Sequence, residues 1–317
     1  MQAFRTIAQT QAAPAMAACR GMATLKQLVE TIQTTKNIAK ITSSMKMVAA
    51  AKLKGDESRL AAGRPFAKWV GTTFSEPLQV DNVKQTNYPV AAECGENPLF
   101  ILVTSDKGLC GAVNSGIMKT IKASHVNFEE ATGKRAPVFV VGEKGRPGMN
   151  NLHKEDITCS INGNWSVPTN FTQTSALALE ALKGAEGCDG AVIFFNTYVS
   201  AIAYAQTWRY VPFINGHLEE GASTEEEMPY ADYEVEPENR GEALDNFSEY
   251  ALTSAMYDAF IENATAFQSS QMSAMENATS NANEMIDALS LRYNRARQAK
   301  ITTELCEIVA GAAALEG

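Results

Sequence analysis

The stretch that decides the fold of this chain is Leu289-Ser-Leu-Arg-Tyr-Asn-Arg-Ala-Arg-Gln-Ala-Lys-Ile-Thr-Thr-Glu-Leu-Cys-Glu-Ile-Val-Ala-Gly-Ala-Ala-Ala-Leu315. It contains no proline, and residues with high helix propensity dominate it. A heptad seam that is apolar except at Arg292 leads into this stretch, at Met275, Ala278, Ala282, Met285, Leu289, Arg292, Ala296 and Ala299. The pattern predicts one helix over residues 242–317, about seventy residues or roughly 105 Å long at 1.5 Å per residue. Such a helix requires a partner along its seam, because it exceeds the core helix of an ordinary globular domain.

A second long helix is predicted over residues 23–76, at the opposite end of the chain. One apolar face begins with Leu25, Leu28 and Ile32 and continues, after a slip in phase, with Ile38, Ile41, Met45 and Val48. Gly63 and Pro65 are expected to kink or end this helix. Two long helices at the two chain ends pack most easily as an antiparallel coiled coil.

The middle of the chain, residues 98–213, has the pattern of a Rossmann-like α/β domain. Short apolar runs predict strands at Phe100–Val103, Pro137–Val141, Ile157–Ile161, Ala191–Phe195 and Ala203–Phe213, the last alternating like a sheet edge. Helices are predicted near Asn114–Ser124 and Phe171–Ala185. Strands that alternate with helices favour a mostly parallel sheet. Residues 77–97 are interpreted as a linker, and residues 214–241 as an acidic loop with one irregular strand near Tyr230–Val235.

Composition excludes several classes of protein. The formal net charge is -9, which argues against a nucleic-acid binder. The charge is uneven, because residues 1–54 contain eight Lys or Arg and one Glu, whereas residues 215–250 are strongly acidic. The six cysteines form no closely spaced pair, so neither a disulfide framework nor a zinc site is expected. No run of eighteen apolar residues occurs, so we expect no insertion into a membrane.

The first 22 residues are interpreted as a targeting segment. They contain Arg5 and Arg20 but no acidic residue, and they are rich in Ala, Gln and Thr. This composition is typical of an organellar transit peptide, and cleavage is expected near residue 22. The alternative interpretation is an unstructured bacterial N-terminus.

Candidate catalytic motifs are weak. The loop Ser105-Asp-Lys-Gly-Leu-Cys-Gly111 follows a predicted strand and could cradle a phosphate, but it matches neither common phosphate-binding pattern, which favours a tight turn. Cys110 has no histidine nearby in the sequence that would activate it as a nucleophile. The three histidines are too scattered for a metal site, and Glu225–Glu227 is most simply a solvated run. We therefore predict no catalytic residue, metal or cofactor.

Two surface features of the predicted helices have competing interpretations. Basic residues lie on both helices, at Lys36, Lys40, Lys46, Arg292, Arg295, Arg297 and Lys300. They are either solvated or face acidic surfaces of another protein. The tip Ile308–Leu315 is apolar on all sides and made mostly of small residues, so it is either a frayed terminus or an end covered by an apolar collar of a partner.

Three blocks of sequence carry a resemblance to a known family. The C-terminal block is Ile301-Thr-Thr-Glu-Leu-Cys-Glu-Ile-Val-Ala-Gly-Ala-Ala-Ala314, joined by Gln271-Met-Ser-Ala-Met-Glu-Asn-Ala-Thr-Ser-Asn-Ala282. The N-terminal block is Ala23-Thr-Leu-Lys26 with Lys40-Ile-Thr-Ser-Ser-Met-Lys-Met-Val-Ala-Ala-Ala-Lys-Leu53, and the central block is Thr104–Asn114. In this order the blocks resemble the gamma subunit of rotary F-type ATP synthases.

The resemblance implies a function for the whole chain. It implies a central-stalk rotor subunit that couples proton-driven rotation of a membrane ring to ATP synthesis, without chemistry or a cofactor of its own. The implied partners are the alpha and beta subunits, which form a hexameric ring, the delta- and epsilon-type stalk subunits, and the membrane c-ring. The implied location is the matrix side of the mitochondrial inner membrane, as a peripheral subunit. The chloroplast type has an inserted pair of cysteines that this chain lacks, which favours the mitochondrial type.

The resemblance also implies which residues contact partners. Arg297 and Gln298 match a pair that hydrogen-bonds an acidic loop of the beta subunit, and Met45 matches a methionine near the same contact. The full set of expected partner contacts is Met45, Lys46, Arg295, Arg297, Gln298, Glu304, Ile308 and Leu315. A stand-alone coiled-coil adaptor with a Rossmann-like domain, expected to form an isolated dimer, is the alternative. An enzyme is a third possibility, which lacks a credible acid, base or nucleophile.

Overall fold

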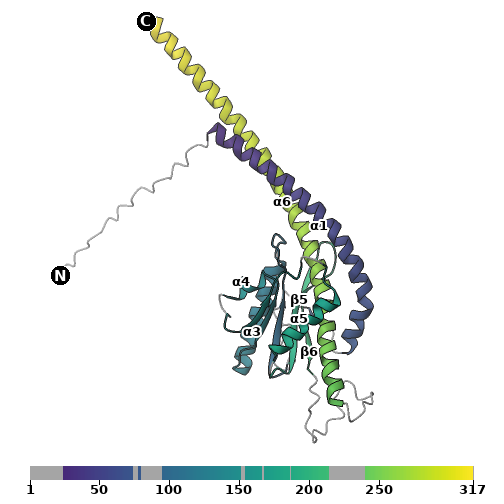
Figure 1. Ribbon diagram of the computed structural model, residues 1–317. Helices are drawn as coiled ribbons and strands as arrows, with labels where there is room; N and C mark the ends of the chain where they lie inside the picture. The colour runs from purple at the N-terminus through teal and green to yellow at the C-terminus, as the bar shows by residue number, and fades with distance from the viewer. Residues whose placement is uncertain are drawn as a thin grey trace, which may run out of the picture. The chain divides into compact units, whose positions relative to one another are not determined.

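The computed structural model describes residues 24–73, 78–79, 95–150, 154–165, 168–185, 187–213 and 240–316 (Figure 1). The chain divides into two compact units, one of Lys40–Thr279 and one of Met1–Ala39 with Ser280–Gly317. The predicted transit peptide lies outside the described residues, as do most of the predicted linker and residues 214–239 of the acidic loop.

Within the Lys40–Thr279 unit, the described strands form a six-stranded sheet in the order β1-β6-β5-β2-β3-β4. The strands are β1 (Leu78–Gln79), β2 (Pro98–Val103), β3 (Val138–Val141), β4 (Ile157–Ile161), β5 (Gly190–Tyr198) and β6 (Tyr204–Pro212). Strands β5, β2, β3 and β4 are parallel neighbours, and β6 and β1 are antiparallel additions. The predicted mostly parallel sheet is confirmed. The prediction of β6 as an edge strand is wrong, because Leu78 and Gln79, inside the predicted linker, pair with Trp208 and Thr207.

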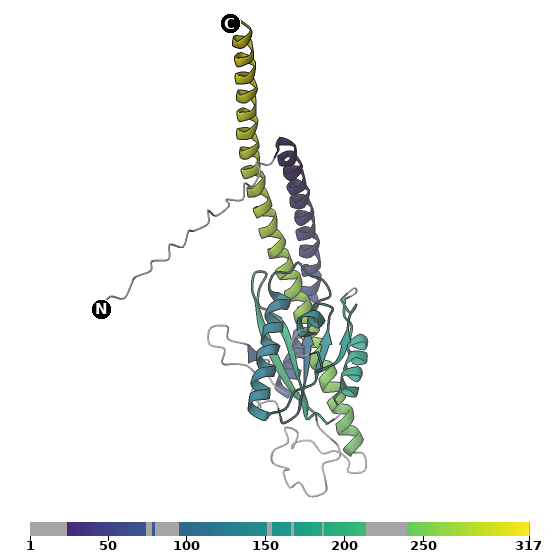
Figure 2. The same cartoon turned by 90° about the vertical axis from the view of Figure 1, so that its left-hand side faces the viewer.

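Helices cover both faces of this sheet (Figures 1 and 2). Helix α3 (Val113–Thr132) and the six-residue α4 (Gly145–Asn150), which was not predicted, pack on the face that carries Phe100 and Leu102. Helix α5 (Phe171–Lys183) packs on the opposite face, which carries Leu99, Ile101 and Val103. This alternation along β2 follows from the pleat of a strand buried on both sides.

The C-terminal helix α6 (Arg240–Glu316) begins as part of this core. Its residues Ala255, Met256, Ala259 and Phe260 are fully buried and pack with α5 against the sheet. The prediction that residues 242–317 serve as one coiled-coil helix therefore needs a correction. The segment around residues 251–260 completes the α/β domain, because it covers apolar side chains of the sheet.

The N-terminal helix α1 (Leu25–Thr73) continues through Pro65, so of the two predicted effects of Gly63 and Pro65, a kink or an end, the end is wrong. A proline inside a helix removes one backbone hydrogen bond and costs about 3 kcal/mol or more. Packing on both sides of the proline compensates for this loss. The Cα of Gly63 lies against α6, since a Cβ there would be 3.7 Å from Ile261 Cδ1. Phe66 packs against the core face that α6 covers.

The two terminal helices are antiparallel, as predicted. Within the Lys40–Thr279 unit, the Thr42 and Thr279 hydroxyls are 2.8 Å apart, and Lys46 Nζ donates to Glu276 Oε1 at 2.7 Å. Contacts that advance along α1 therefore recede along α6, which defines the antiparallel direction.

The phase of the seam on α1 differs from the prediction. One row of buried or half-buried positions steps by three and four without a slip, at Leu25, Leu28, Ile32, Thr35, Ala39, Thr42, Lys46, Ala49, Leu53, Asp56 and Leu60. Beside this row, Ser43, Met45, Ala50 and Glu57 are half-buried. The aliphatic residues that indicated a slip are exposed, with Ile38 at 48%, Ile41 at 58% and Val48 at 57%. Small and polar residues occupy the seam here because they allow two helices to approach closely.

The seam on α6 is confirmed at Met275, Ala278, Ala282, Leu289 and Ala296, which are buried or half-buried, whereas Ala299 is exposed. Thr279, Ile286, Ser290 and Tyr293 are also half-buried. The predicted seam residues Met285 and Arg292 are exposed, Met285 at 54%, and Ile286 and Tyr293 take their places. A one-residue step turns a side chain by about 100° around the helix, so two adjacent large residues compete for one seam position.

Candidate functional site

The far end of α6 is the most exposed apolar segment that the structure describes. Every residue from Arg297 to Leu315 is exposed, including Ile308 at 69% and Leu315 at 90%. Helix propensity keeps this segment helical although no described residue covers it. Exposed apolar surface of this length typically marks a contact with another protein.

The predicted contact residues fall into two groups. Arg295, Arg297, Gln298, Glu304, Ile308 and Leu315 are exposed on α6, in the unit that contains Ser280–Gly317. Met45 and Lys46 are half-buried on α1, in the Lys40–Thr279 unit. Lys46 forms an ion pair with Glu276, and Glu304 forms one with Lys300, whose Nζ lies 3.5 Å from Glu304 Oε1. Both are exposed ion pairs, so solvent screens them and their contribution to stability is small.

The glycine-bearing loop after β2 is a tightly bonded turn. Leu109 and Gly111 both have left-handed backbone, with φ of 63° and 61°. The Asn114 side chain donates to Ser105 Oγ at 2.7 Å and to Cys110 Sγ at 3.3 Å. On α6, Ser270 Oγ donates to the carbonyl oxygen of Cys110 at 2.7 Å. The loop therefore joins the sheet to α6, and its glycine supplies the turn.

Cys110 is unsuited to nucleophilic chemistry. The thiol is 3% exposed, and burial raises its pKa, although the hydrogen bond from Asn114 opposes this. A thiol with a raised pKa stays protonated near neutral pH, whereas the thiolate is the reactive form. Among the described residues, no group of three His, Cys, Asp or Glu side chains could hold a metal ion.

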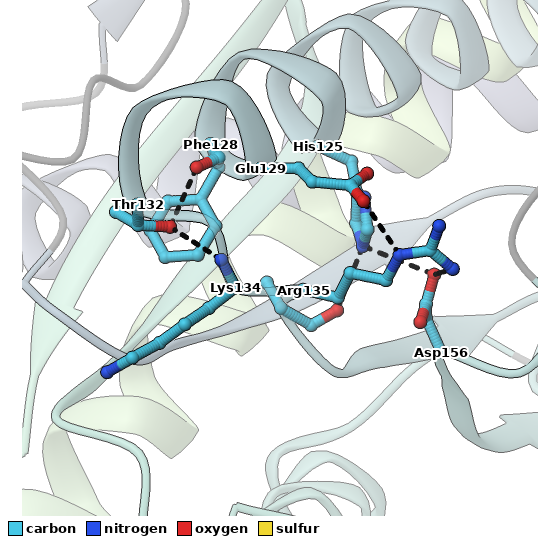
Figure 3. A network of polar contacts seen from close by, with 8 residues as sticks. His125, Phe128, Glu129, Thr132, Lys134, Arg135 and Asp156 are labelled. Atoms are coloured by element: carbon cyan, nitrogen blue, oxygen red, sulfur yellow. Dashed lines mark hydrogen bonds and ion pairs between the residues drawn. The ribbon is translucent and has the colours of Figure 1, made fainter.

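A network around His125 joins α3 to strands β3 and β4 (Figure 3). The buried His125 Nε2 lies 3.0 Å from the carbonyl oxygen of Ala136 and 3.6 Å from Asp156 Oδ2. Arg135 Nε donates to Glu129 Oε1 at 3.0 Å, and its Nη1 lies 4.0 Å from Asp156 Oδ2. These contacts fix the turn after α3 and are structural.

A second polar cluster lies between the sheet and α6. Arg209 on β6 and Asp258 on α6 are 2% and 8% exposed, and their Nη2 and Oδ2 atoms are 2.9 Å apart. One turn along α6, Glu262 accepts from the backbone N–H of Tyr198 at 2.7 Å. Burial, with a smaller contribution from Asp258, raises the pKa of Glu262 to about 7. The hydrogen bond from the Tyr198 N–H and the nearby arginines act in the opposite direction and lower this pKa. The Tyr198 hydroxyl donates to Glu57 on α1.

Comparisons with known proteins agree with this architecture. An ATP synthase family model matches residues 24–315. The chain is 37% identical over 291 residues to the mitochondrial ATP synthase subunit gamma of Ipomoea batatas, covering 90% of this chain and 83% of that protein. It is 36% identical over 297 residues to the mitochondrial ATP synthase subunit gamma of Drosophila melanogaster, covering 93% of this chain and 92% of that protein. A chain in the Euglena gracilis mitochondrial ATP synthase structure (OSCP/F1/c-ring) matches with a TM-score of 0.70 at 20% identity, over 92% and 94% of the two chains.

Fold and site together define a protein with paired terminal helices and an α/β domain, in which no described residue covers the apolar end of α6. The chain belongs to the ATP synthase gamma family, as the family model over residues 24–315 and the relatives at 36% and 37% identity show. As a gamma subunit it is a non-catalytic component of its complex. The mitochondrial relatives indicate a mitochondrial location. None of the described helices is both long and apolar enough to cross a membrane.

Proposed function

We propose that this chain is the central-stalk rotor subunit of a proton-driven ATP synthase. The observation that carries the proposal is the exposure of every residue from Arg297 to Leu315 at the end of α6. A rotor that turns inside a ring of other subunits needs a slim end with no permanent cover from its own chain. Small residues such as those at 310–314 keep this end narrow.

The mechanism follows from an asymmetric shaft within a ring of alpha and beta subunits. The two helices expose different side chains. Helix α1 exposes aliphatic Ile38, Ile41 and Val48, and helix α6 exposes basic Arg295 and Arg297. Each beta subunit therefore meets a different surface as the shaft turns. A ligand shifts a conformational equilibrium by its differential contacts with the two states, and the orientation of the shaft acts as such a ligand.

Eight residues are proposed to contact the ring: Met45, Lys46, Arg295, Arg297, Gln298, Glu304, Ile308 and Leu315. Arg297 and Gln298 would hydrogen-bond an acidic loop of beta, and Ile308 and Leu315 would enter an apolar collar. The exposure of all four side chains supports these roles. Lys46 has three donors, so its bond to Glu276 leaves it able to bind an acidic partner as well.

The α/β domain is the proposed foot, which meets the c-ring and the delta- and epsilon-type stalk subunits. The complex would lie on the matrix side of the mitochondrial inner membrane, with residues 1–22 removed on import. N-terminal sequencing of the mature chain tests the cleavage, which is expected near residue 22.

Two experiments test the assignment. Purification of the tagged protein from its own mitochondria under mild conditions should recover ATP synthase alpha and beta subunits. Recovery of an isolated dimer without them would support the adaptor alternative. The variant Arg297→Glu should impair coupled ATP synthesis with unchanged circular dichroism, whereas Arg292→Glu, the same charge reversal at an exposed arginine of α6 outside the eight proposed contacts, should not. Equal rates for both variants would remove the assigned role of Arg297.

A further inference from the structure

A cavity of about 460 Å³ lies between α1, α6 and the loops that follow β2 and β4. Its size is within the range of sites that hold small organic ligands. All of its lining residues belong to the Lys40–Thr279 unit. Ser105 and Lys107 come from the loop after β2, and Trp165 and Thr169 from the loop after β4. The carboxyl ends of parallel strands are where open α/β sheets typically place ligands.

The charge of the lining favours an anion. Three cationic side chains, Lys52, Arg59 and Lys107, line the cavity with one carboxylate, Asp56. Arg59 Nη1 and Asp56 Oδ1 form an ion pair at 2.8 Å, which leaves the two lysines as uncompensated positive charges of the lining. Lys52 and Lys107 are exposed and can turn toward a bound group.

Part of the remaining lining is apolar and aromatic. Phe260, Phe267 and Ile261 of α6 line one side, with Met45 of α1. Trp165 lies against Phe260 with ring centroids 5.7 Å apart in an edge-to-face arrangement. Aromatic and aliphatic walls next to a pair of lysines suit a molecule with a planar apolar part and a negative group.

Buried polar atoms of the lining also point to a ligand. Trp165 Nε1, Thr169 Oγ1 and Gln268 Oε1 are buried and have no hydrogen-bond partner among the described residues. An unsatisfied buried polar group costs about 1–3 kcal/mol, so three around one cavity are costly without a bound polar molecule. They comprise a donor, a hydroxyl and an acceptor.

The loops that carry these groups are held in place before any ligand binds. Asp106 Oδ2 accepts from the backbone N–H of Trp165 at 3.1 Å, and its Oδ1 accepts from that of Glu143 at 3.0 Å. One carboxylate thus joins the loop after β2 to the loops after β3 and β4. Such preorganisation reduces the entropy lost on binding.

We propose that this cavity binds a small organic anion with a planar apolar part, about the size of a nucleoside monophosphate. Lys52 and Lys107 bind the anionic group, and the ring lies among Trp165, Phe260 and Phe267. Polar atoms at the edge of the ligand's ring form hydrogen bonds with Gln268 Oε1 and with the indole N–H of Trp165. Because the cavity is bounded by both terminal helices and the α/β domain, occupancy would stiffen the joint between them.

The test is calorimetric titration of the full chain with adenosine 5′-monophosphate and, separately, with 1-naphthoate. Saturable binding of at least one compound is expected. Tighter binding of adenosine 5′-monophosphate would indicate a nucleotide ligand, and tighter binding of 1-naphthoate would indicate another aromatic anion. The double variant Lys52→Ala/Lys107→Ala should bind at least tenfold more weakly, whereas Lys119→Ala on α3 should bind like the wild type. Both changed lysines are exposed, so folding should persist, and circular dichroism checks it.

Several results would overturn the proposal. They include no binding of either compound at millimolar concentration, unchanged affinity in the folded double variant, and inorganic phosphate binding as tightly as the aromatic anions. The last result would leave no role for the apolar walls. Quenching of fluorescence on saturation, lost in Trp165→Phe, gives a second readout, and quenching that persists in Trp165→Phe would place the ligand elsewhere.

Discussion

Replacing Asp258 by asparagine should be among the most destabilising single changes in the α/β domain. Asp258 is the carboxylate partner of Arg209, at 2.9 Å, and the two side chains are 8% and 2% exposed. Burial raises the pKa of Asp258, although Arg209 opposes this. The guanidinium Nε and Nη1 atoms have no hydrogen-bond partner among the described residues, and the nearest aromatic contact is the Phe195 ring, 5.9 Å from Cζ. Asp258→Asn therefore leaves a buried positive charge without its counter-ion.

The expected cost is about 3–5 kcal/mol in the free energy of unfolding, the range for breaking a buried ion pair. This corresponds to roughly a 100-fold or larger change in the folding equilibrium. Urea unfolding of the full chain, followed by circular dichroism, measures it. Glu276→Gln is the matched control, because it breaks the Lys46–Glu276 pair, whose side chains are 39% and 60% exposed, and should cost less than about 1 kcal/mol.

A double variant separates the lost charge from lost packing. Arg209→Met combined with Asp258→Leu removes both charges and should be more stable than Asp258→Asn alone, since buried pairs replaced by apolar residues are often neutral. If Asp258→Asn costs no more than Glu276→Gln, then Arg209 is solvated in solution and the argument from burial is wrong.

Three further predictions concern other parts of the chain. Between about pH 4.5 and about 7 the folded chain holds a proton on Glu262 that the unfolded chain releases, so the free energy of unfolding should fall as pH rises through this window; Glu262→Gln should reduce that slope in pH-dependent urea melts, and an unchanged slope would contradict the raised pKa of Glu262. Ile286→Ala should lower the thermal stability of the paired helices by about 1–2 kcal/mol, whereas Met285→Ala should change it by less than about 0.5 kcal/mol; the reverse order would restore the originally predicted seam. Gly142→Ala should destabilise the fold by about 3 kcal/mol or more in urea unfolding, because the backbone there has a φ of 102° and the new Cβ would lie 2.2 Å from the backbone oxygen of Thr104. Gly311→Ala should stabilise the helix by up to about 1 kcal/mol, because no atom lies within 4 Å of the new Cβ. Equal effects of the two substitutions would contradict this reasoning.

Local patterns were sufficient to predict most of the elements. The strands from Phe100, Pro137 and Ala191 are short apolar runs, and such runs predict buried parallel strands. The terminal helices were predictable for a similar reason, because helix propensity and the lack of breakers act residue by residue. The family was predictable from three blocks of sequence in a particular order.

Burial was less predictable, because it depends on what lies opposite. On α1 the aliphatic Ile38, Ile41 and Val48 indicated the seam, yet Thr35 and Ala39 occupy it. A hydrophobic pattern does not distinguish a helix face that packs within its own chain from a helix face that binds another protein, since both require apolar residues at helical spacing.

The helices, the parallel strands and the family of this protein could be predicted from the chain alone, because propensity, periodicity and motif are properties of neighbouring residues. Three features depend instead on the packing of distant segments: which helical face is buried, the part of α6 that completes the α/β core, and the cavity that Lys52, Lys107 and Trp165 line. These three residues are more than a hundred positions apart from first to last and lie on a helix and two loops. Their proximity follows from the packing of α1 and α6 on the sheet, which no local pattern encodes.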